Sequence, residues 1–105
     1  MPPSKNPILE AIQSGRLGAA LRAASAALAA AEEGYPGGQR NLGRMYAEGL
    51  GVPRDYVQAY MWLDLAAAQG DTVAANSRDK VSVKMTPDQI ARAQRLAREW
   101  KPRPR

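Results

Sequence analysis

The chain has 105 residues, a length that suffices for one small domain with a single core. Its formal net charge is +5. The absence of cysteine and histidine excludes a disulfide framework and a thiolate metal site, and it removes the commonest general base and zinc ligand. Hydrophobic residues make up 45% of the sequence, but there is no Phe and much of this fraction is alanine. The interior must therefore be formed by small side chains between closely approaching helices.

The sequence has no long apolar segment. No stretch approaches the roughly 20 apolar residues that a membrane-spanning helix needs, and the first ten residues, MPPSKNPILE, lack the apolar run of a secretory signal. These features favour a cytoplasmic location without membrane association. An envelope location would require that a leader has been removed. No cofactor is expected.

The N-terminal third of the chain predicts two helices. Asn6 is a favourable N-cap, and Pro7 at the first helical position opens a short helix that stops near Gly15. Its apolar residues are Ile8, Leu9 and Ile12. A second helix is expected from around Leu17 or Gly18 to residue 33, where Gly34 supplies a left-handed cap. The apolar stripe of this helix should consist of Leu17, Leu21, Ala24 and Leu28.

Glycine and proline divide the middle of the chain. The segment from Tyr35 to Gly38 contains one Pro and two Gly and predicts a turn. A third helix is expected over residues 39–48, with Leu42, Met45 and Tyr46 facing inward. The glycines of the loop 49–53 permit the positive φ angles with which the chain reverses.

The start of the fourth helix has a capping signal. Asp55 and Gln58 have the spacing of a capping box, and the helix should end at Gly70. Its expected buried residues are Ala59, Trp62, Leu63 and Ala66. Asp71 is then placed to cap a fifth helix that continues through Val73 and Ala74 to Val81.

The last helix has the clearest start signal. Thr86 is the N-cap, Pro87 occupies the first helical position, and Gln89 occupies the third, as in a capping box. One face of this helix continues through Ile90, Ala93, Leu96, Ala97 and Trp100. The chain therefore consists of helices joined by short turns.

An internal repeat with a period of 36 residues is visible. The shift pairs Ala23 with Ala59, Ala30 with Ala66, Ala31 with Ala67, and Gly34 with Gly70. Alanine is abundant enough for chance pairs, but both segments end in Ala-Ala-x-x-Gly, in which the glycine ends a helix. A period of this length is typical of two-helix solenoid repeats.

Residues 41 to 70 contain three motifs in a fixed order. The first is Asn41-Leu42-Gly43 followed by Met45-Tyr46, and the second is the turn Gly-Leu-Gly-Val-Pro-Arg-Asp that ends at Asp55. The third comprises Ala59, Trp62, Ala66, Ala67 and Gly70. In this order and spacing they resemble the Sel-one-like repeats, which are close relatives of the tetratricopeptide repeats.

The resemblance implies an all-α fold, a short right-handed α-solenoid of stacked helix-turn-helix repeats with five or six helices. Ala26 stands where the family has Trp, so the register of the first helix pair remains open. The resemblance also implies a bacterial, non-enzymatic adaptor that binds a protein partner. The expected single domain, 1–105, comprises a degenerate N-terminal pair (1–38), a Sel-one-like repeat (39–70), capping helices (71–101) and a flexible tail (102–105).

Most of the conspicuous residues have a structural explanation. Tyr46 and Trp62 occur at helical spacing among small neighbours and are expected in the core rather than in a ligand platform. The glycines of residues 49–51 lack the preceding strand and the Lys-Ser/Thr of a phosphate-binding loop. Asp55 is expected to cap a helix, and Asp64 has no recognisable partner. No catalytic constellation or metal site is therefore predicted.

A basic surface is the predicted partner site. In solenoids of this kind, the first helix of each pair lines the concave surface. Arg40 and Arg44 lie one turn apart, and the 36-residue shift places Asn76 and Lys80 at the same positions on the fifth helix. Together with Asn41 they would suit an acidic peptide, because Arg pairs with carboxylates and Asn with a peptide backbone. The alternative is that all five are ordinary solvated residues.

The C-terminal helix and tail form a second basic region. Its cations are Arg92, Arg95, Arg98, Lys101, Arg103 and Arg105, against Glu99. Such an excess attracts nucleic acid, which is the alternative function. A solvated helix face is the structural alternative, since no aromatic residue alternates with the charges. The oligomeric state remains open between a monomer and a homodimer formed through the Ala-rich second helix.

Overall fold

The computed structural model describes residues 15–104, and this part of the chain contains helices and no strands. The five helices are α2 (Arg16–Glu32), α3 (Pro36–Glu48), α4 (Tyr56–Ala68), α5 (Thr72–Ser82) and α6 (Pro87–Glu99). The predicted all-α class is confirmed, as is the order of these helices. The short helix predicted to start at Pro7 lies outside the described residues.

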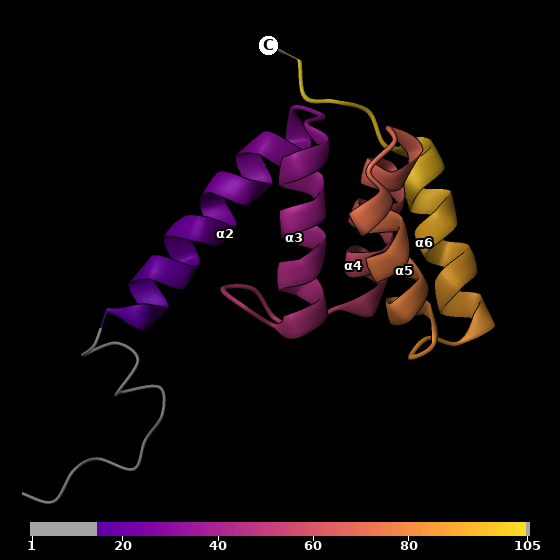
Figure 1. Ribbon diagram of the computed structural model, residues 1–105, viewed down its shortest axis with the longest axis horizontal. Coiled ribbons are helices and arrows are strands. Elements are labelled where there is room, and N and C mark those ends of the chain that lie inside the picture. Colours follow the sequence, from indigo (N-terminus) through magenta and orange to yellow (C-terminus); the bar gives the residue numbers. More distant parts are fainter. Residues whose placement is uncertain (1–14, 105) are drawn as a thin grey trace, which may run out of the picture.

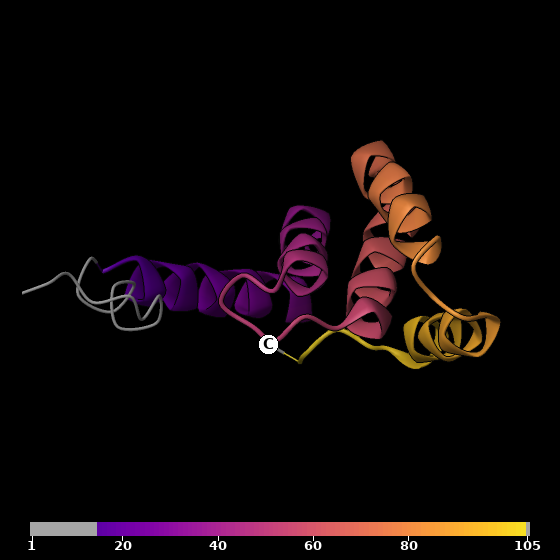
Figure 2. The ribbon, with the colours of Figure 1, turned by 90° about the horizontal axis from the view of Figure 1, so that it is seen from below.

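Helix α4 is at the centre of the structure and packs against α3, α5 and α6. At the other end α2 packs on α3, and the two helices diverge from their shared turn (Figure 1). The view from below shows that the helices follow one another across the molecule and do not close into a bundle (Figure 2). The dimensions are 53 × 35 × 21 Å, so the shortest is about two helix diameters, as in a two-layer solenoid.

The helices approach each other closely at two glycines of α3. A Cβ atom added to Gly43 would lie 2.7 Å from Leu63 Cγ and 3.1 Å from the carbonyl oxygen of Ala59 on α4. A Cβ atom added to Gly38 would lie 2.5 Å from the Cβ atom of Ala30 on α2. At these distances the neighbouring backbone would have to move, so both crossings depend on glycine.

The packing face of α2 differs from the predicted one. Leu21 is 52% exposed and Leu28 is 39% exposed, so the predicted stripe through these leucines is wrong. The close approach of Gly38 to Ala30 leaves no room for a leucine between α2 and α3. The side chain of Leu17 lies outside the described ones. Ala24, which belongs to the predicted stripe, is buried as expected, and Ala27 and Ala31 complete the buried face in place of the leucines.

The 36-residue repeat is visible in the helix ends. Gly34 after α2 has a φ angle of 97°, and Gly70 after α4 has a φ angle of 99°. The residue after each glycine donates its backbone N–H to the carbonyl oxygen of Ala30 or Ala66, at 3.1 and 3.2 Å. This is the long hydrogen bond of a Schellman cap. The predicted equivalence of Gly34 and Gly70 is therefore confirmed.

Two of the predicted side-chain caps are complete. The carboxylate of Asp71 accepts the Ala74 backbone N–H at 2.9 Å, and Thr86 and Gln89 form both bonds of a capping box. Helix α3 starts at Pro36, three residues earlier than predicted. Pro36 was expected in a turn, but it occupies the first position of the helix. Proline is favoured there, since the N–H that it lacks has no partner inside a helix.

The capping box predicted for α4 is only half formed. The Asp55 carboxylate accepts the Gln58 backbone N–H at 3.1 Å, as expected. The return bond from the Gln58 side chain is missing, because the backbone N–H of Asp55 donates to the Tyr46 carbonyl oxygen at 3.0 Å. The start of α4 is thereby bonded to the end of α3 and not to its own first turn.

A buried polar contact joins the two helix pairs. Gln39 is 0% exposed, and its Nε2 atom donates to the Ala31 carbonyl oxygen at 3.4 Å. Its Oε1 atom accepts a hydrogen bond of 2.8 Å from Gln69, which also donates to the Gly34 carbonyl oxygen at 3.0 Å. These bonds pair polar groups whose burial without partners would be costly.

The C-terminal residues return to α2. The ring of Trp100 meets that of Trp62 edge to face, with centroids 5.9 Å apart. Arg103 then donates its backbone N–H to the Glu32 carbonyl oxygen at 2.7 Å and pairs with the Glu32 carboxylate. Whereas the sequence predicts a flexible tail over 102–105, Figure 1 shows the tail crossing from α6 to the shared end of α2 and α3.

The close crossings predict opposite effects for two neighbouring glycines. Gly43→Ala should lower the free energy of unfolding by about 1–3 kcal/mol, because its Cβ would force α3 and α4 apart. Gly37→Ala is the matched control, since nothing lies within 4 Å of its added Cβ, and it should leave stability unchanged or raise it by up to about 1 kcal/mol. Urea denaturation followed by circular dichroism measures both. Equal effects of the two substitutions would contradict the close crossing.

Candidate functional site

A hollow of about 510 Å³ lies between α2 and α3 and is termed the α2–α3 groove. Its volume falls in the range of about 300–1,000 Å³ that is usual for binding sites. Helix α3 and the loop after it contribute the apolar side chains of Met45 and Leu50. The floor on α2 consists of Ala23, Ala26, Ala27 and Ala30.

The polar lining of the groove comes from α3. Asn41, Arg44 and Glu48 are exposed and lie on successive turns of this helix. Within residues 15–104, the side chains of Asn41 and Arg44 make no hydrogen bond or ion pair. A guanidinium group beside an apolar floor favours a ligand with a carboxylate next to an apolar group.

Arg40 is occupied by a contact within the protein. Its Nη1 atom lies 2.7 Å from the Asp71 carboxylate, whose side chain is only 10% exposed. The same carboxylate caps α5 through the Ala74 backbone N–H, so Arg40 connects α3 to the start of α5. No local pattern in the sequence marks this pair, since Arg40 and Asp71 lie 31 residues apart.

The predicted residues on α5 lie apart from the α2–α3 groove. Asn76 and Lys80 are both exposed. Lys80 lines a smaller hollow of about 170 Å³ with Glu48, Tyr56 and Lys84, whereas Asn76 lines neither hollow. Of the five predicted residues, the structure therefore brings Asn41 and Arg44 together in one groove and places the others elsewhere.

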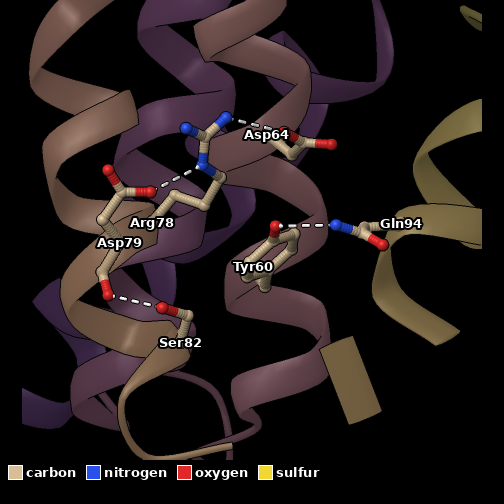
Figure 3. A network of polar contacts seen from close by, with 6 residues as sticks. All are labelled: Tyr60, Asp64, Arg78, Asp79, Ser82 and Gln94. Atoms are coloured by element: carbon tan, nitrogen blue, oxygen red, sulfur yellow. Dashed lines mark hydrogen bonds and ion pairs between the residues drawn. The ribbon is translucent and has the colours of Figure 1, made fainter. Parts of the chain in front are cut away.

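A polar network that the sequence did not predict connects α4 to α5 and α6. Arg78 of α5 donates to Asp64 of α4 at 2.9 Å and to the adjacent Asp79 at 3.2 Å (Figure 3). One turn before Asp64 on α4, the Tyr60 hydroxyl accepts a hydrogen bond of 3.2 Å from Gln94 of α6 (Figure 3). Asp64 thus has a partner, although none was recognisable in the sequence.

The contacts of Arg78 stabilise the protonated form of its guanidinium group. Burial alone lowers the pKa of its guanidinium group, but the contacts with Asp64 and Asp79 outweigh burial and raise the pKa above its ordinary value. A raised pKa of a cation means that its stabilising contribution is complete below the unfolded-state pKa and is lost only in strongly alkaline solution. The network is therefore structural and not a pH switch near neutrality.

The arginines of α6 are free of such contacts. Arg92, Arg95 and Arg98 are exposed, and none of them pairs with a residue in the described range. Arg103 differs, because Glu32 binds it. Arg105 lies outside the described residues. The basic C-terminal region is thus divided into a free helix face and an anchored tail.

Comparison with protein families identifies the central helices. Residues 36–71, which include α3, α4 and the cap of α5, match the family model of the Sel1 repeat. The chain contains a Sel1 repeat. The resemblance of residues 39–70 to the Sel-one-like repeats is thereby confirmed. Sel1 repeats are helical solenoid repeats that generally mediate protein–protein interactions. A search of the curated proteins finds no match.

The Sel1 repeat family is a scaffold for protein interaction and is generally non-enzymatic. Within residues 15–104, no three His, Cys, Asp or Glu side chains are grouped so that they could hold a metal ion. In the same range, no helix has both the length and the apolar composition that crossing a membrane requires. Arg40, Asn41 and Arg44 lie inside the Sel1 repeat, whereas Asn76 and Lys80 follow it.

The two arginines of α3 should respond differently to charge reversal. Arg40→Glu should lower the free energy of unfolding by about 1.5–3 kcal/mol, because it places a carboxylate against the shielded Asp71. Arg44→Glu should change it by less than about 0.5 kcal/mol, since Arg44 is exposed and has no partner in the described range. Urea denaturation of both variants tests this difference. A stable Arg40→Glu variant would show that the pair with Asp71 is unimportant.

Proposed function

We propose that the chain is an adaptor whose α2–α3 groove binds an acidic segment of a partner protein. The observation that supports this proposal is Arg44, an exposed cation without a partner in residues 15–104, beside an apolar hollow of about 510 Å³. Asn41 lies one turn before it and offers an amide to the partner's backbone. The interaction function of Sel1 repeats supports the same reading.

The other predicted residues have secondary roles in this proposal. Arg40 remains 33% exposed and adds positive potential beside the groove, while its main contact is with Asp71. Asn76 and Lys80 extend the polar surface along α5, which contacts α3. A long partner segment would reach them after it leaves the α2–α3 groove.

Arg44→Glu is the decisive variant, because it replaces the positive charge of Arg44 in the groove lining with a negative one without breaking an internal contact in the described range. In pull-downs from the native cell, quantified by mass spectrometry, it should deplete at least one partner that the unaltered chain retains. With that partner purified, the affinity should fall by at least about tenfold, or 1.4 kcal/mol. Arg92→Glu on α6 is the matched control and should retain the partner. If the Arg44→Glu variant retained every partner, the proposal that the α2–α3 groove binds the partner would be wrong.

Nucleic-acid binding through α6 is the second candidate, and the observation that favours it is the unpaired state of Arg92, Arg95 and Arg98. It predicts that Arg92→Glu with Arg95→Glu abolishes binding to a labelled oligonucleotide and that binding weakens steeply with salt. Truncation before α6 is a poor test, since α6 buries Ala93 and Ala97 in the core. Loss of oligonucleotide binding with Arg44→Glu alone would instead place the nucleic acid in the α2–α3 groove.

A further inference from the structure

The smaller hollow, of about 170 Å³, lies where the end of α3 meets the start of α4 and the end of α5, and it is termed the Tyr56 hollow. It is smaller than the range of about 300–1,000 Å³ that is usual for small-molecule sites, so it suits one ionic group rather than a whole organic ligand. No residue of α2 takes part in its lining, which consists of Ala47, Glu48, Tyr56, Lys80, Val81 and Lys84.

Two lysines of the Tyr56 hollow carry charges that the described residues do not neutralise. Lys80 and Lys84 are both exposed, and their spacing of four residues brings two like charges close together. Within residues 15–104 neither lysine forms an ion pair, although the carboxylate of Glu48 lines the same hollow. The helix dipole favours a cation at Lys80, in the last turn of α5, but does not explain Lys84, which follows the helix.

Tyr56 forms a wall of the hollow and holds two cations near it. Its ring packs against the core. The ammonium nitrogen of Lys84 lies 5.7 Å from the ring centroid, and the guanidinium carbon of Arg54 lies 5.6 Å from it. The Tyr56 hydroxyl makes no hydrogen bond with another described residue, so its O–H is available as a donor.

We infer that the Tyr56 hollow binds a phosphate group. Lys80, Lys84 and the Tyr56 hydroxyl donate hydrogen bonds to its oxygens, and Arg54 adds positive potential from beside the ring. These three cations and the carboxylate of Glu48 give a local net charge of +2. A phosphate ester carries a charge of about −1.5 to −2 near neutral pH, whereas a carboxylate would neutralise only half of the excess. This site does not rest on the proposed adaptor function.

Inorganic phosphate is the first probe, titrated into the full chain near neutral pH at constant ionic strength and followed by two-dimensional NMR. The backbone signals of Glu48, Tyr56, Lys80 and Lys84 should shift saturably, with a Kd below about 10 mM. Acetate at the same ionic strength is the control for a single negative charge and should bind at least about tenfold more weakly. Equal responses to the two anions, or shifts that do not saturate, would overturn the inference.

Substitutions locate the bound phosphate. Lys80→Gln with Lys84→Gln should lower the phosphate affinity at least about tenfold. Arg98→Gln with Lys101→Gln is the matched control, because it removes the same charge from exposed residues outside the hollow, and it should leave the affinity unchanged. Tyr56→Phe retains the ring and lacks only the O–H donor, so a smaller loss of about threefold is expected. Equal affinities of the two double variants would contradict binding in the Tyr56 hollow.

Glu48→Gln distinguishes a loss of binding from a loss of structure. It removes the carboxylate that opposes an anion in the hollow, so the phosphate affinity should rise. A variant that binds phosphate more tightly cannot owe its effect to unfolding. A lower affinity of Glu48→Gln would overturn the inference.

A blocked pentapeptide with a central phosphoserine among glycine and alanine identifies the source of the phosphate group. Binding at least about tenfold tighter than that of inorganic phosphate indicates a phosphorylated partner protein, and equal binding indicates a free phosphate. Either result supports the site, provided that the unphosphorylated peptide does not bind.

The phosphate site and the proposed function fail separately. Arg44→Glu should release the protein partner but leave the phosphate affinity unchanged, because Arg44 does not line the Tyr56 hollow. If Arg44→Glu alone abolished phosphate binding, the phosphate would lie in the α2–α3 groove and the inference would be wrong. If Arg44→Glu released no partner while phosphate still bound, only the adaptor proposal would fail.

Discussion

The close contact between α3 and its neighbours is the constraint on which the rest of the structure depends. Gly43 brings the backbone of α3 against Leu63 of α4, and Gly38 brings it against Ala30 of α2. With so little space between helices, the core is formed by alanines and a few larger residues. A Cβ atom added at Gly38 or Gly43 would force the two helices at that crossing apart. The same closeness displaces Leu21 and Leu28 to the surface of α2.

This constraint separates the residues that define the Sel1 repeat from those available for binding. Leu42, Gly43, Ala59, Trp62 and Ala66 are buried, so a partner could reach them only by unfolding the repeat. The exposed face of α3 has no such restriction. Asn41 and Arg44 occupy this face beside the motif residues, and they line a groove whose floor is the same small-residue surface that permits close packing on α3. The proposed binding surface thus follows from the close packing of α2 and α3 and does not require a separate motif.

The sequence predicted what local rules determine. Helix order, the caps at Asp71 and Thr86, and the equivalence of Gly34 and Gly70 follow from side-chain bonds and turn geometry that act over a few residues. It failed where a distant contact competes with a local one. The second bond of the Asp55 capping box is missing because the Tyr46 carbonyl takes the Asp55 N–H, and the Leu stripe of α2 is exposed because α3 lies too close. The site was predicted in part for the same reason, since the pairing of Arg40 with Asp71 spans 31 residues.

Net positive charge is therefore a poor guide to the proposed binding surface of this chain. Arg40, Arg78 and Arg103 belong to the same residue type as Arg44, yet each of the three fastens one helix to another element through a carboxylate. What distinguishes Arg44 is its position one turn further along α3, beyond the reach of Asp71 and beside the alanines of α2. A cation that residues 15–104 leave unpaired, next to an apolar surface that these residues leave exposed, is a stronger indication of a partner site than the total charge, because both features would be satisfied by the same ligand.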